Sequence, residues 1–389
     1  MHNESLLDHL LEIPSCALIA TGRTGSDFLQ SLLDSHPEVL TFNGTLFFYS
    51  FWDNSVCVKA KNFNTNDLLQ EFIGKHIELL KSRYDLMERK NQLGETFDQS
   101  LDIDLIQFKK NASQILQNRE LNPKNILLAI YASYAICLGQ DIRKKRLFFH
   151  HAHHFDALDP FLKDFPNSKV ICMTRDPRAN FVSLIEKWRP YSPTDNERHL
   201  YYCAKRIYND TTIMKKYNNE YIAIRVEDLN RGCIFEKLCN WLDIAYNDCL
   251  KKSTWGGLLW LGDSLTSKNL SGGRSRDILK NKWEEKLSFA DKLIFNFILN
   301  KRLKHYNYSY EKISFVDPIL VLFFILLPLS HETRFFSINY IKDSLKKKEY
   351  QKTLKNIIFY FLRVFLFLKY YFNAIKKSGF SQPFLQCDD

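Results

Sequence analysis

The sequence predicts an α/β protein with a central parallel sheet and flanking helices. The first observation is a short apolar run at Ala17–Ala20 that leads through a glycine-containing turn into a helical pattern. The second is an apolar run at Lys169–Thr174 that leads into a helix with Pro177 in its first turn. A further strand is predicted at Leu147–Phe149. Because parallel strands end at the same sheet edge, the turns after these strands are expected to lie together.

The turn after the first strand has the composition of an anion-binding loop. Gly22 and Gly25 permit a tight turn and a close approach of an anion to the backbone. Arg23 adds a permanent charge in a planar fork that matches phosphate or sulfate oxygens, and Thr24 and Ser26 add hydroxyl donors. The N–H groups of the turn and the positive end of the next helix converge, which predicts a phosphate site. An ordinary strand-to-helix turn is the alternative.

This loop is not a Walker A sequence, because it contains no Gly-Lys-Ser or Gly-Lys-Thr. Asp27 stands where a metal-binding hydroxyl is expected in such loops. Its carboxylate repels a phosphate unless it caps the helix and points away.

A second anion site is predicted after Lys169–Thr174. Arg175 follows this strand, Asp176 is suited to cap the next helix, and Pro177 suits the first helical turn. Ser183 follows Arg175 after eight residues. This strand also ends at a helix N-terminus, so the second site is expected at the same sheet edge as the first.

The two motifs resemble those of the sulfotransferases that use 3′-phosphoadenosine 5′-phosphosulfate (PAPS). The 5′-phosphosulfate loop of that family has the form Pro-(Lys/Arg)-Ser-Gly-Thr-(Thr/Ser), and it resembles Gly22–Asp27, with Gly22 in place of Pro and Asp27 in place of the second hydroxyl. The stretch at 32–38, LLDSHPE, continues the pattern of members with Arg in the loop. Arg175 and Ser183 keep the spacing of the family's 3′-phosphate signature.

The resemblance, which covers roughly residues 15–300, implies a P-loop-like sheet and transfer of a sulfuryl group from PAPS to an acceptor hydroxyl. No metal is implied. Arg23 is expected to neutralise charge on the leaving oxygen. A looser similarity of Gly272-Gly273-Arg274 to the family's C-terminal Arg-Lys-Gly segment implies two more phosphate ligands. The cofactor-binding residues implied are Gly22, Arg23, Thr24, Gly25, Ser26, Asp27, Arg175, Ser183, Arg274 and Arg276.

Four histidines, His150, His151, His153 and His154, follow the strand predicted at Leu147–Phe149. Residues two apart on a strand share a face, so His151 and His153 are expected to point to one side. The residues leave open a zinc site, a catalytic base or a solvated strand end. The resemblance to cytosolic sulfotransferases implies His153 as base, with His151 in place of an assisting Lys. The tyrosylprotein branch has a Glu base at the position of Asn43, which cannot take a proton.

The predicted organisation is a sulfotransferase domain at 1–312, with a helical acceptor region at about 60–145, and a tail at 313–389. The net charge of +10 suits an anionic cofactor, an anionic substrate or a membrane surface. Nucleic acid is disfavoured as a partner because no nucleic-acid module accompanies the charge. Nine scattered cysteines without a CxxC pair favour reduced thiols in the cytoplasm, and the acidic N-terminus does not resemble a signal peptide.

The tail combines apolar runs with cations. The run at 319–329 is too short to span a bilayer, and the run at 357–372 is interrupted by two cations. At about 100° per residue the cations fall within roughly 140° of one another. This pattern predicts a peripheral helix on the cytoplasmic face of an anionic membrane, and packing of a helical pair on the domain is the alternative. The cations are Lys352, Lys355, Arg363, Lys369, Lys376 and Lys377, and the apolar side contains Phe361, Val364, Phe365, Leu368 and Phe372.

The acceptor is not specified by a motif. A loop with Trp255 and Trp260 is suited to stack on sugar faces, and lipid-linked glycans are built at cytoplasmic membrane surfaces. A carbohydrate or glycolipid hydroxyl is therefore favoured over a lipid or small-molecule alcohol. Two rival functions are a nucleotide-dependent kinase, which needs magnesium, and a non-catalytic membrane-bound nucleotide-binding protein, which does not need the histidines.

Overall fold

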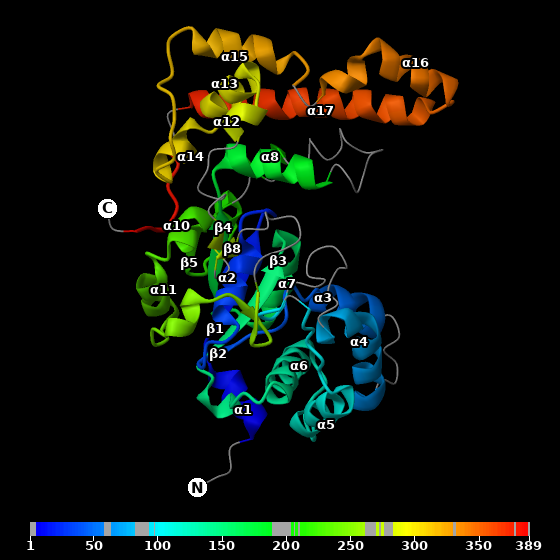
Figure 1. Cartoon of the computed structure of the whole chain (residues 1–389), viewed down its shortest axis with the longest axis vertical. Coiled ribbons are helices and arrows are strands. Elements are labelled where there is room, and N and C mark those ends of the chain that lie inside the picture. Colours follow the sequence, from blue (N-terminus) through cyan, green and yellow to red (C-terminus); the bar gives the residue numbers. More distant parts are fainter. Residues whose placement is uncertain are drawn as a thin grey trace. The chain divides into compact units, whose positions relative to one another are not determined.

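A computed structural model describes residues 5–57, 64–81, 93–96, 98–188, 204–205, 207–208, 211–260, 270–271, 274–275, 283–329, 332–376 and 379–387 (Figure 1). The chain divides into two compact units, which are described separately. Unit 1 comprises Met1–Met173, Met214–Leu279 and Leu385–Asp389, and unit 2 comprises Thr174–Ile213 and Lys280–Phe384. The boundary predicted at residue 312 falls inside unit 2 and stays a prediction.

A six-stranded sheet in the order β10-β5-β4-β1-β3-β2 confirms the predicted α/β fold with a central sheet. The pairs β1–β3, β1–β4 and β2–β3 are parallel. The predicted strands at Ala17–Ala20 and Leu147–Phe149 lie inside β1 and β3, and the one at Lys169–Thr174 is β4. The strands are β1 (Ser15–Ala20), β2 (Val39–Leu40), β3 (Leu147–His153), β4 (Lys169–Thr174), β5 (Tyr221–Arg225) and β10 (Phe384–Leu385).

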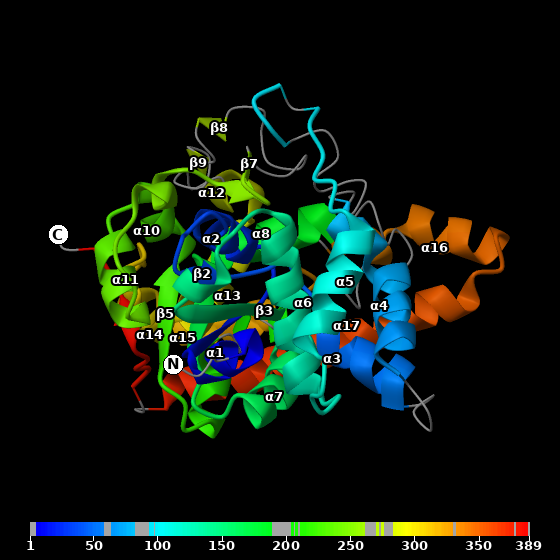
Figure 2. The same cartoon turned by 90° about the horizontal axis from the view of Figure 1, so that it is seen from below.

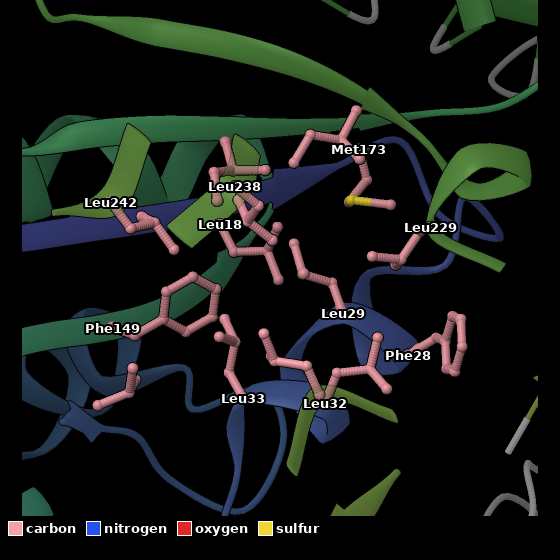
Figure 3. Packing of buried hydrophobic residues seen from close by; sticks show 14 of the residues in the cluster. Leu18, Phe28, Leu29, Leu32, Leu33, Phe149, Met173, Leu229, Leu238 and Leu242 are labelled. Carbon is pink, nitrogen blue, oxygen red and sulfur yellow. The ribbon is translucent and has the colours of Figure 1, made fainter. Parts of the chain in front are cut away.

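One face of this sheet is covered by apolar side chains of helices from two parts of the chain. Leu29 of α2 and Leu238 of α11 belong to the same buried cluster as Leu18, Phe149 and Met173 of the strands (Figure 3). In each strand the residues of this cluster alternate along the chain, as expected for side chains on one face. The helices on this side are α2 (Ser26–Leu33), α10 (Val226–Arg231) and α11 (Phe235–Leu242).

The opposite face packs against α6 and α7. Phe148 and His150 of β3 contact Tyr131 of α6 and Phe161 of α7. The described part of the predicted helical region at 60–145 contains helices, and α5 packs against both α4 and α6 (Figure 2). The remaining elements of unit 1 are α1 (Leu6–Glu12), α3 (Phe48–Phe51), the π-helix η1 (Trp52–Cys57), α4 (Thr65–Leu80), α5 (Leu105–Ile115), α6 (Pro123–Cys137), η3 (Ile142–Lys144), α7 (Phe155–Asp164), η5 (Asp248–Lys251), β6 (Thr254–Trp255), β7 (Leu258–Leu259), β8 (Leu270–Ser271) and β9 (Arg274–Ser275).

The regular structure of unit 2 in its described parts is mainly helical. α13 packs against both α15 and α17, with Phe295 of α13 against Phe367 and Phe297 against Tyr371. The helices are α8 (Pro177–Trp188), α12 (Trp283–Lys286), α13 (Phe289–Ile298), α14 (Asn300–His305), α15 (Asp317–Ile325), η7 (Thr333–Phe336), α16 (Ile338–Lys346) and α17 (Tyr350–Ile375), and η4 (Thr211–Lys216) crosses the boundary between the units.

The predicted basic side of the tail is wrong at Arg363. Its guanidinium is fully buried and donates to both carboxylate oxygens of Glu332, at 2.9 and 2.6 Å. It also donates to the carbonyl oxygens of Ile325 and Leu327, so this cation joins α17 to the end of α15. Val364 is likewise buried. Lys355, Lys369 and Lys376 are exposed, while Lys377 lies outside the described residues.

The expectation that the cysteines are reduced does not hold at one pair. Cys233 and Cys387 are joined in a disulfide within unit 1, although 154 residues separate them in the chain. The described cysteines that are free are Cys16, Cys137, Cys172, Cys239 and Cys249. The cytoplasmic location stays a prediction.

Candidate active site

The turn between β1 and α2 contains left-handed residues, which are frequent in anion-binding turns. Three residues adopt positive φ angles, namely Gly22 at 89°, Arg23 at 56° and Gly25 at 84°. Positive φ is uncommon for a residue with a side chain, and such strain concentrates where ligands bind. The buried hydroxyl of Thr24 has no hydrogen-bond partner among the residues that the structure describes. A buried hydroxyl of this kind is available to donate a hydrogen bond to a bound group.

The position of Gly25 is enforced by packing as well as by its φ angle. A Cβ added to Gly25 would lie 2.3 Å from Cγ2 of Val226, the first residue of α10. The side chain of Val226 is buried. Arg225 and Asp228 hold this corner together through a buried ion pair, with the guanidinium 2.6 and 2.5 Å from the carboxylate oxygens. The loop therefore packs at Gly25 against the apolar side chain of Val226.

Asp27 lies in the first turn of α2, where a negative side chain is favourable. Its side chain is 38% exposed and its Oδ1 is 3.7 Å from Nδ1 of His151. The N-cap residue is Gly25, which has no side chain to accept the N–H groups of this turn. The first turn of α2 thus combines the positive end of a helix with a carboxylate near a histidine.

The four histidines of the β3 region lie in three environments. His151 is fully buried on the α2 side of the sheet, and His153 Nδ1 is 3.1 Å from His151 Nε2, as the shared strand face predicts. His150 lies on the other face, where Tyr131 hydroxyl is 2.8 Å from its Nδ1 and burial lowers the pKa of its imidazole to about 3. His154 is the N-cap residue of α7 and stacks on Phe47.

Backbone geometry places His153 beside the end of β1. Leu18 pairs with His151 but Ile19 pairs with His153, so β3 has a bulge beside the end of β1. His153 itself has a φ angle of 64°, in the left-handed region. Bulges and strained residues of this kind redirect side chains beside functional sites.

Gln30 of α2 determines the tautomers of the two histidines. Its amide nitrogen donates to the carbonyl oxygens of Phe42 and Gly44, so its Oε1 faces Nδ1 of His151 at 2.8 Å. Nδ1 of His151 must therefore carry the hydrogen, and its Nε2 accepts from Nδ1 of His153. In the neutral pair the lone pair of His153 is consequently on Nε2.

These hydrogen bonds do not favour the zinc interpretation, because both ring nitrogens of His151 are already engaged. Among the described residues, one other group of potential metal ligands comprises Asp228, Cys233 and Cys387. Its sulfur atoms are joined in the disulfide and its carboxylate is bonded to Arg225.

The second predicted motif begins unit 2. Asp176 caps α8 as expected, since its Oδ1 accepts from the N–H of Arg178 at 2.9 Å. The two side chains also form a buried ion pair, and the guanidinium lies 4.0 Å from the ring centroid of Trp283. Arg175 lies just before this cap, and Ser183 is partly buried on α8. The cap anchors the backbone from which both predicted phosphate ligands project.

The profile of the sulfotransferase family matches residues 16–248, which include both motifs and the histidines. The chain belongs to the sulfotransferase family. A search of curated proteins found no match. The chain is similar to the sulfotransferase domain from the Synechococcus PCC 7002 olefin synthase, with 16% identity and a TM-score of 0.34 over 70% of this chain and 86% of that one. It is also similar to the sulfotransferase domain from the curacin biosynthetic pathway, with 16% identity and a TM-score of 0.32 over 62% and 77% of the two chains.

The tryptophans of the sulfotransferase do not support the predicted stacking on a sugar. Trp255 is fully buried and Trp260 is 6% exposed, and both belong to the core cluster of unit 1. Arg274 lies in the short strand β9, which pairs with β8. Gly272, Gly273 and Arg276 fall outside the described residues.

Sequence reasoning missed Gln30, and it included Asp34 only as part of the stretch at 32–38, without a role. Asp34 is buried, and its carboxylate accepts from Thr254 and from the N–H groups of Gly256 and Gly257. It therefore ties the end of α2 to the β6–β7 turn. For Gln30 the available signal was a polar residue placed among the apolar residues of a core helix, but such a residue has no motif of its own.

Proposed function

We propose that this enzyme transfers a sulfuryl group from PAPS to an acceptor hydroxyl, with His153 as the general base. The observation that carries this proposal is the chain of hydrogen bonds from Gln30 through His151 to His153. It assigns the lone pair of neutral His153 to Nε2, and a base of this kind typically contributes about 10²–10⁴-fold to a rate. Family membership supports PAPS as the donor.

The residues of the loop fit a phosphosulfate group. The positive φ angles of Gly22, Arg23 and Gly25 form a concave set of N–H groups, and the buried Thr24 hydroxyl offers a donor. The Ser26 hydroxyl and the first turn of α2 add to this field. Arg23 stabilises the charge that grows on the leaving oxygen. Asp27 belongs to the loop, where we propose that its carboxylate acts on His151.

PAPS, when bound, supplies the sulfuryl group and departs as adenosine 3′,5′-bisphosphate. The S–O bond to the 5′-phosphate breaks as sulfur bonds to the acceptor oxygen, and the electron pair stays on the phosphate oxygen. The proton of the acceptor hydroxyl moves to Nε2 of His153. His151 accepts the Nδ1 hydrogen of His153 throughout and so stabilises the imidazolium that forms.

The other contacts to PAPS are proposed mainly from the sequence. Arg175 and Ser183 bind the 3′-phosphate, and their support is the eight-residue spacing after β4 together with the cap that Asp176 forms. Arg274 and Arg276 are proposed as further ligands on the strength of the family resemblance. The transfer requires no metal in this proposal, because protein cations meet the charge.

The acceptor that we propose is a carbohydrate hydroxyl on a lipid-linked glycan, reached from the cytoplasmic face of a membrane. The buried tryptophans no longer support it. Its support is the exposed apolar and basic surface of unit 2 that is described below.

The test is a single-turnover assay with sulfur-labelled PAPS and a cell membrane extract. We expect adenosine 3′,5′-bisphosphate to form, label to appear in the lipid-linked fraction, and a metal chelator to have no effect. His153→Ala should lower turnover by about 10²–10⁴-fold and leave donor affinity nearly unchanged, and His151→Ala should have a smaller effect. The proposal fails if His153→Ala retains full turnover, whereas magnesium dependence would favour the kinase.

A further inference from the structure

We propose that the exposed side of α17 binds parallel to the surface of a bilayer that contains anionic lipids. The proposal concerns unit 2 alone and does not depend on the reaction described above. Its starting point is the distribution of exposed apolar side chains. In the described part of the chain, the large hydrophobic side chains that are exposed outside residues 313–375 are Phe47, Ile106, Tyr246, Phe289 and Tyr310, and all the others lie within that segment.

The exposed apolar side chains of α17 form a continuous stripe. Leu354, Ile358, Phe361, Phe365 and Phe372 are 48–67% exposed and recur every three to seven residues. At about 100° per residue all exposed side chains of the helix fall within an arc of roughly 160°. With 26 residues, the helix is about 39 Å long. An apolar stripe of this length on a folded protein marks an interaction surface.

The charges on this side identify the partner. Lys355, Lys369 and Lys376 are exposed beside the stripe, and the sequence of α17 contains no Asp or Glu. A second copy of the chain would bring further lysines to the interface without carboxylates on this helix to pair with them. An anionic bilayer accepts both features, because the rings enter the acyl boundary while the lysine stems reach the headgroups.

The rest of the helix indicates that it lies on the bilayer and does not cross it. Among the described helices, Thr353–Ile375 is long and apolar enough to cross a membrane, by length and composition alone. Its other side, however, is occupied by packing against α13, α15 and α16. Arg363 on that side is buried against Glu332 and two carbonyl groups, a polar cluster that belongs inside a protein. Figure 1 shows α17 with these helices along its length.

The test measures co-flotation of the full chain with vesicles in the absence of PAPS. One set contains phosphatidylcholine alone and the other phosphatidylcholine with phosphatidylglycerol. We expect binding to the anionic vesicles, partial loss of binding in high salt, and release by alkaline carbonate. Salt removes only part of the binding because the apolar contribution is not screened.

Point variants distinguish binding through the apolar stripe from nonspecific adsorption to vesicles. Phe361→Asp with Phe365→Asp should lower the partition coefficient by at least about fiftyfold. Lys355→Ala with Lys369→Ala should lower it by roughly 25-fold on anionic vesicles and leave neutral vesicles unaffected. The matched controls in unit 1, Ile106→Asp and Lys110→Ala, replace exposed residues and should bind as the natural chain does. Circular dichroism confirms that each variant is folded.

Three results would overturn the proposal. The first is failure of the full chain to bind anionic vesicles, or equal binding by the Phe361→Asp, Phe365→Asp variant. The second is retention in the membrane after carbonate, which indicates a helix that crosses it. The third is a stable dimer in light scattering that the same double variant converts to monomer, since the stripe would then face a second copy.

Discussion

Gln30 acts on the proposed base through His151. Replacing Gln30 with Leu removes the oxygen that holds the hydrogen on Nδ1 of His151. We expect kcat to fall by about ten- to a hundredfold, with the affinity for adenosine 3′,5′-bisphosphate unchanged, because a hydrogen bond that supports a charged group is worth about 1.5–3 kcal/mol.

A second substitution at Gln30 distinguishes an effect on the protonation of the histidines from a purely structural effect. Gln30→Glu keeps an acceptor but adds a negative charge, which stabilises the protonated form of the His151–His153 pair. The acidic limb of the pH profile of kcat should therefore move to higher pH. An unchanged pH profile would contradict the role assigned to Gln30.

Arg175 is expected to discriminate between nucleotides with and without a 3′-phosphate. Arg175→Ala should weaken binding of adenosine 3′,5′-bisphosphate roughly ten- to a hundredfold and binding of AMP far less, because one charge-assisted hydrogen bond is worth about 1.5–3 kcal/mol. Calorimetry with both nucleotides measures this. Arg146→Ala, which removes an exposed arginine beside Glu38, is the control. Equal losses for the two nucleotides would remove the 3′-phosphate assignment.

At the scale of elements, the junction of β1 and α2 depends on Gly25. Gly25→Ala places a Cβ 2.3 Å from Val226 and imposes a φ angle of 84° on a residue with a side chain. We expect a loss of about 2–4 kcal/mol in the free energy of unfolding, from backbone strain and overpacking together. Urea denaturation measures it. Gly74→Ala in α4 is the matched control, since its Cβ meets nothing within 4 Å, and it should stabilise by up to about 1 kcal/mol. Similar effects of the two variants would contradict the argument.

The connection between α15 and α17 depends on the buried pair of Arg363 and Glu332. Glu332→Gln leaves a buried guanidinium without its carboxylate and should destabilise by about 3–5 kcal/mol. The double variant Arg363→Met, Glu332→Leu should lose less than Glu332→Gln alone, because no charge is left buried. Glu186→Gln breaks the exposed contact with Lys286 in the same unit and should change stability by at most about 1 kcal/mol. Equal effects of Glu332→Gln and Glu186→Gln in denaturant titrations would contradict this.

For the whole molecule, His150 makes stability depend on pH. Burial lowers the pKa of its imidazole to about 3 in the folded chain, whereas an unfolded histidine titrates near about 6.5. Below about pH 6.5 the unfolded state therefore binds a proton that the folded state does not. The free energy of unfolding falls by about 1.4 kcal/mol per pH unit from this group as the pH decreases toward 3.

His150→Gln should remove that part of the slope while keeping a side chain that can bond to Tyr131. Denaturant titrations between about pH 5 and pH 8 measure the slope. Burial also lowers the pKa values of His36 and His76, so the natural chain and the variant share a residual slope. Identical slopes would show that His150 titrates alike in both states.

Much of the fold was predictable because it depends on local patterns. The strand at Lys169–Thr174 has the predicted bounds, since the pattern of apolar residues that defines a strand acts over a few residues. Pro177 and Asp176 likewise begin α8 as expected. Spacing on the tail was less informative. It placed Arg363 with the exposed cations, because periodicity shows which side chains share a side and not what covers it.

By itself the sequence determined the strand-to-helix turns, the glycine-rich loop with Arg23, and the shared face of His151 and His153, because each is a property of adjacent residues. Only the tertiary structure decided which residues that are far apart in the chain contact one another. It placed Gln30 against His151 and Val226 beneath Gly25, and it buried Trp255, Trp260 and Arg363. These contacts join segments up to about two hundred residues apart in a packed interior, where shape and hydrogen-bond partners, and not local spacing, select the neighbour.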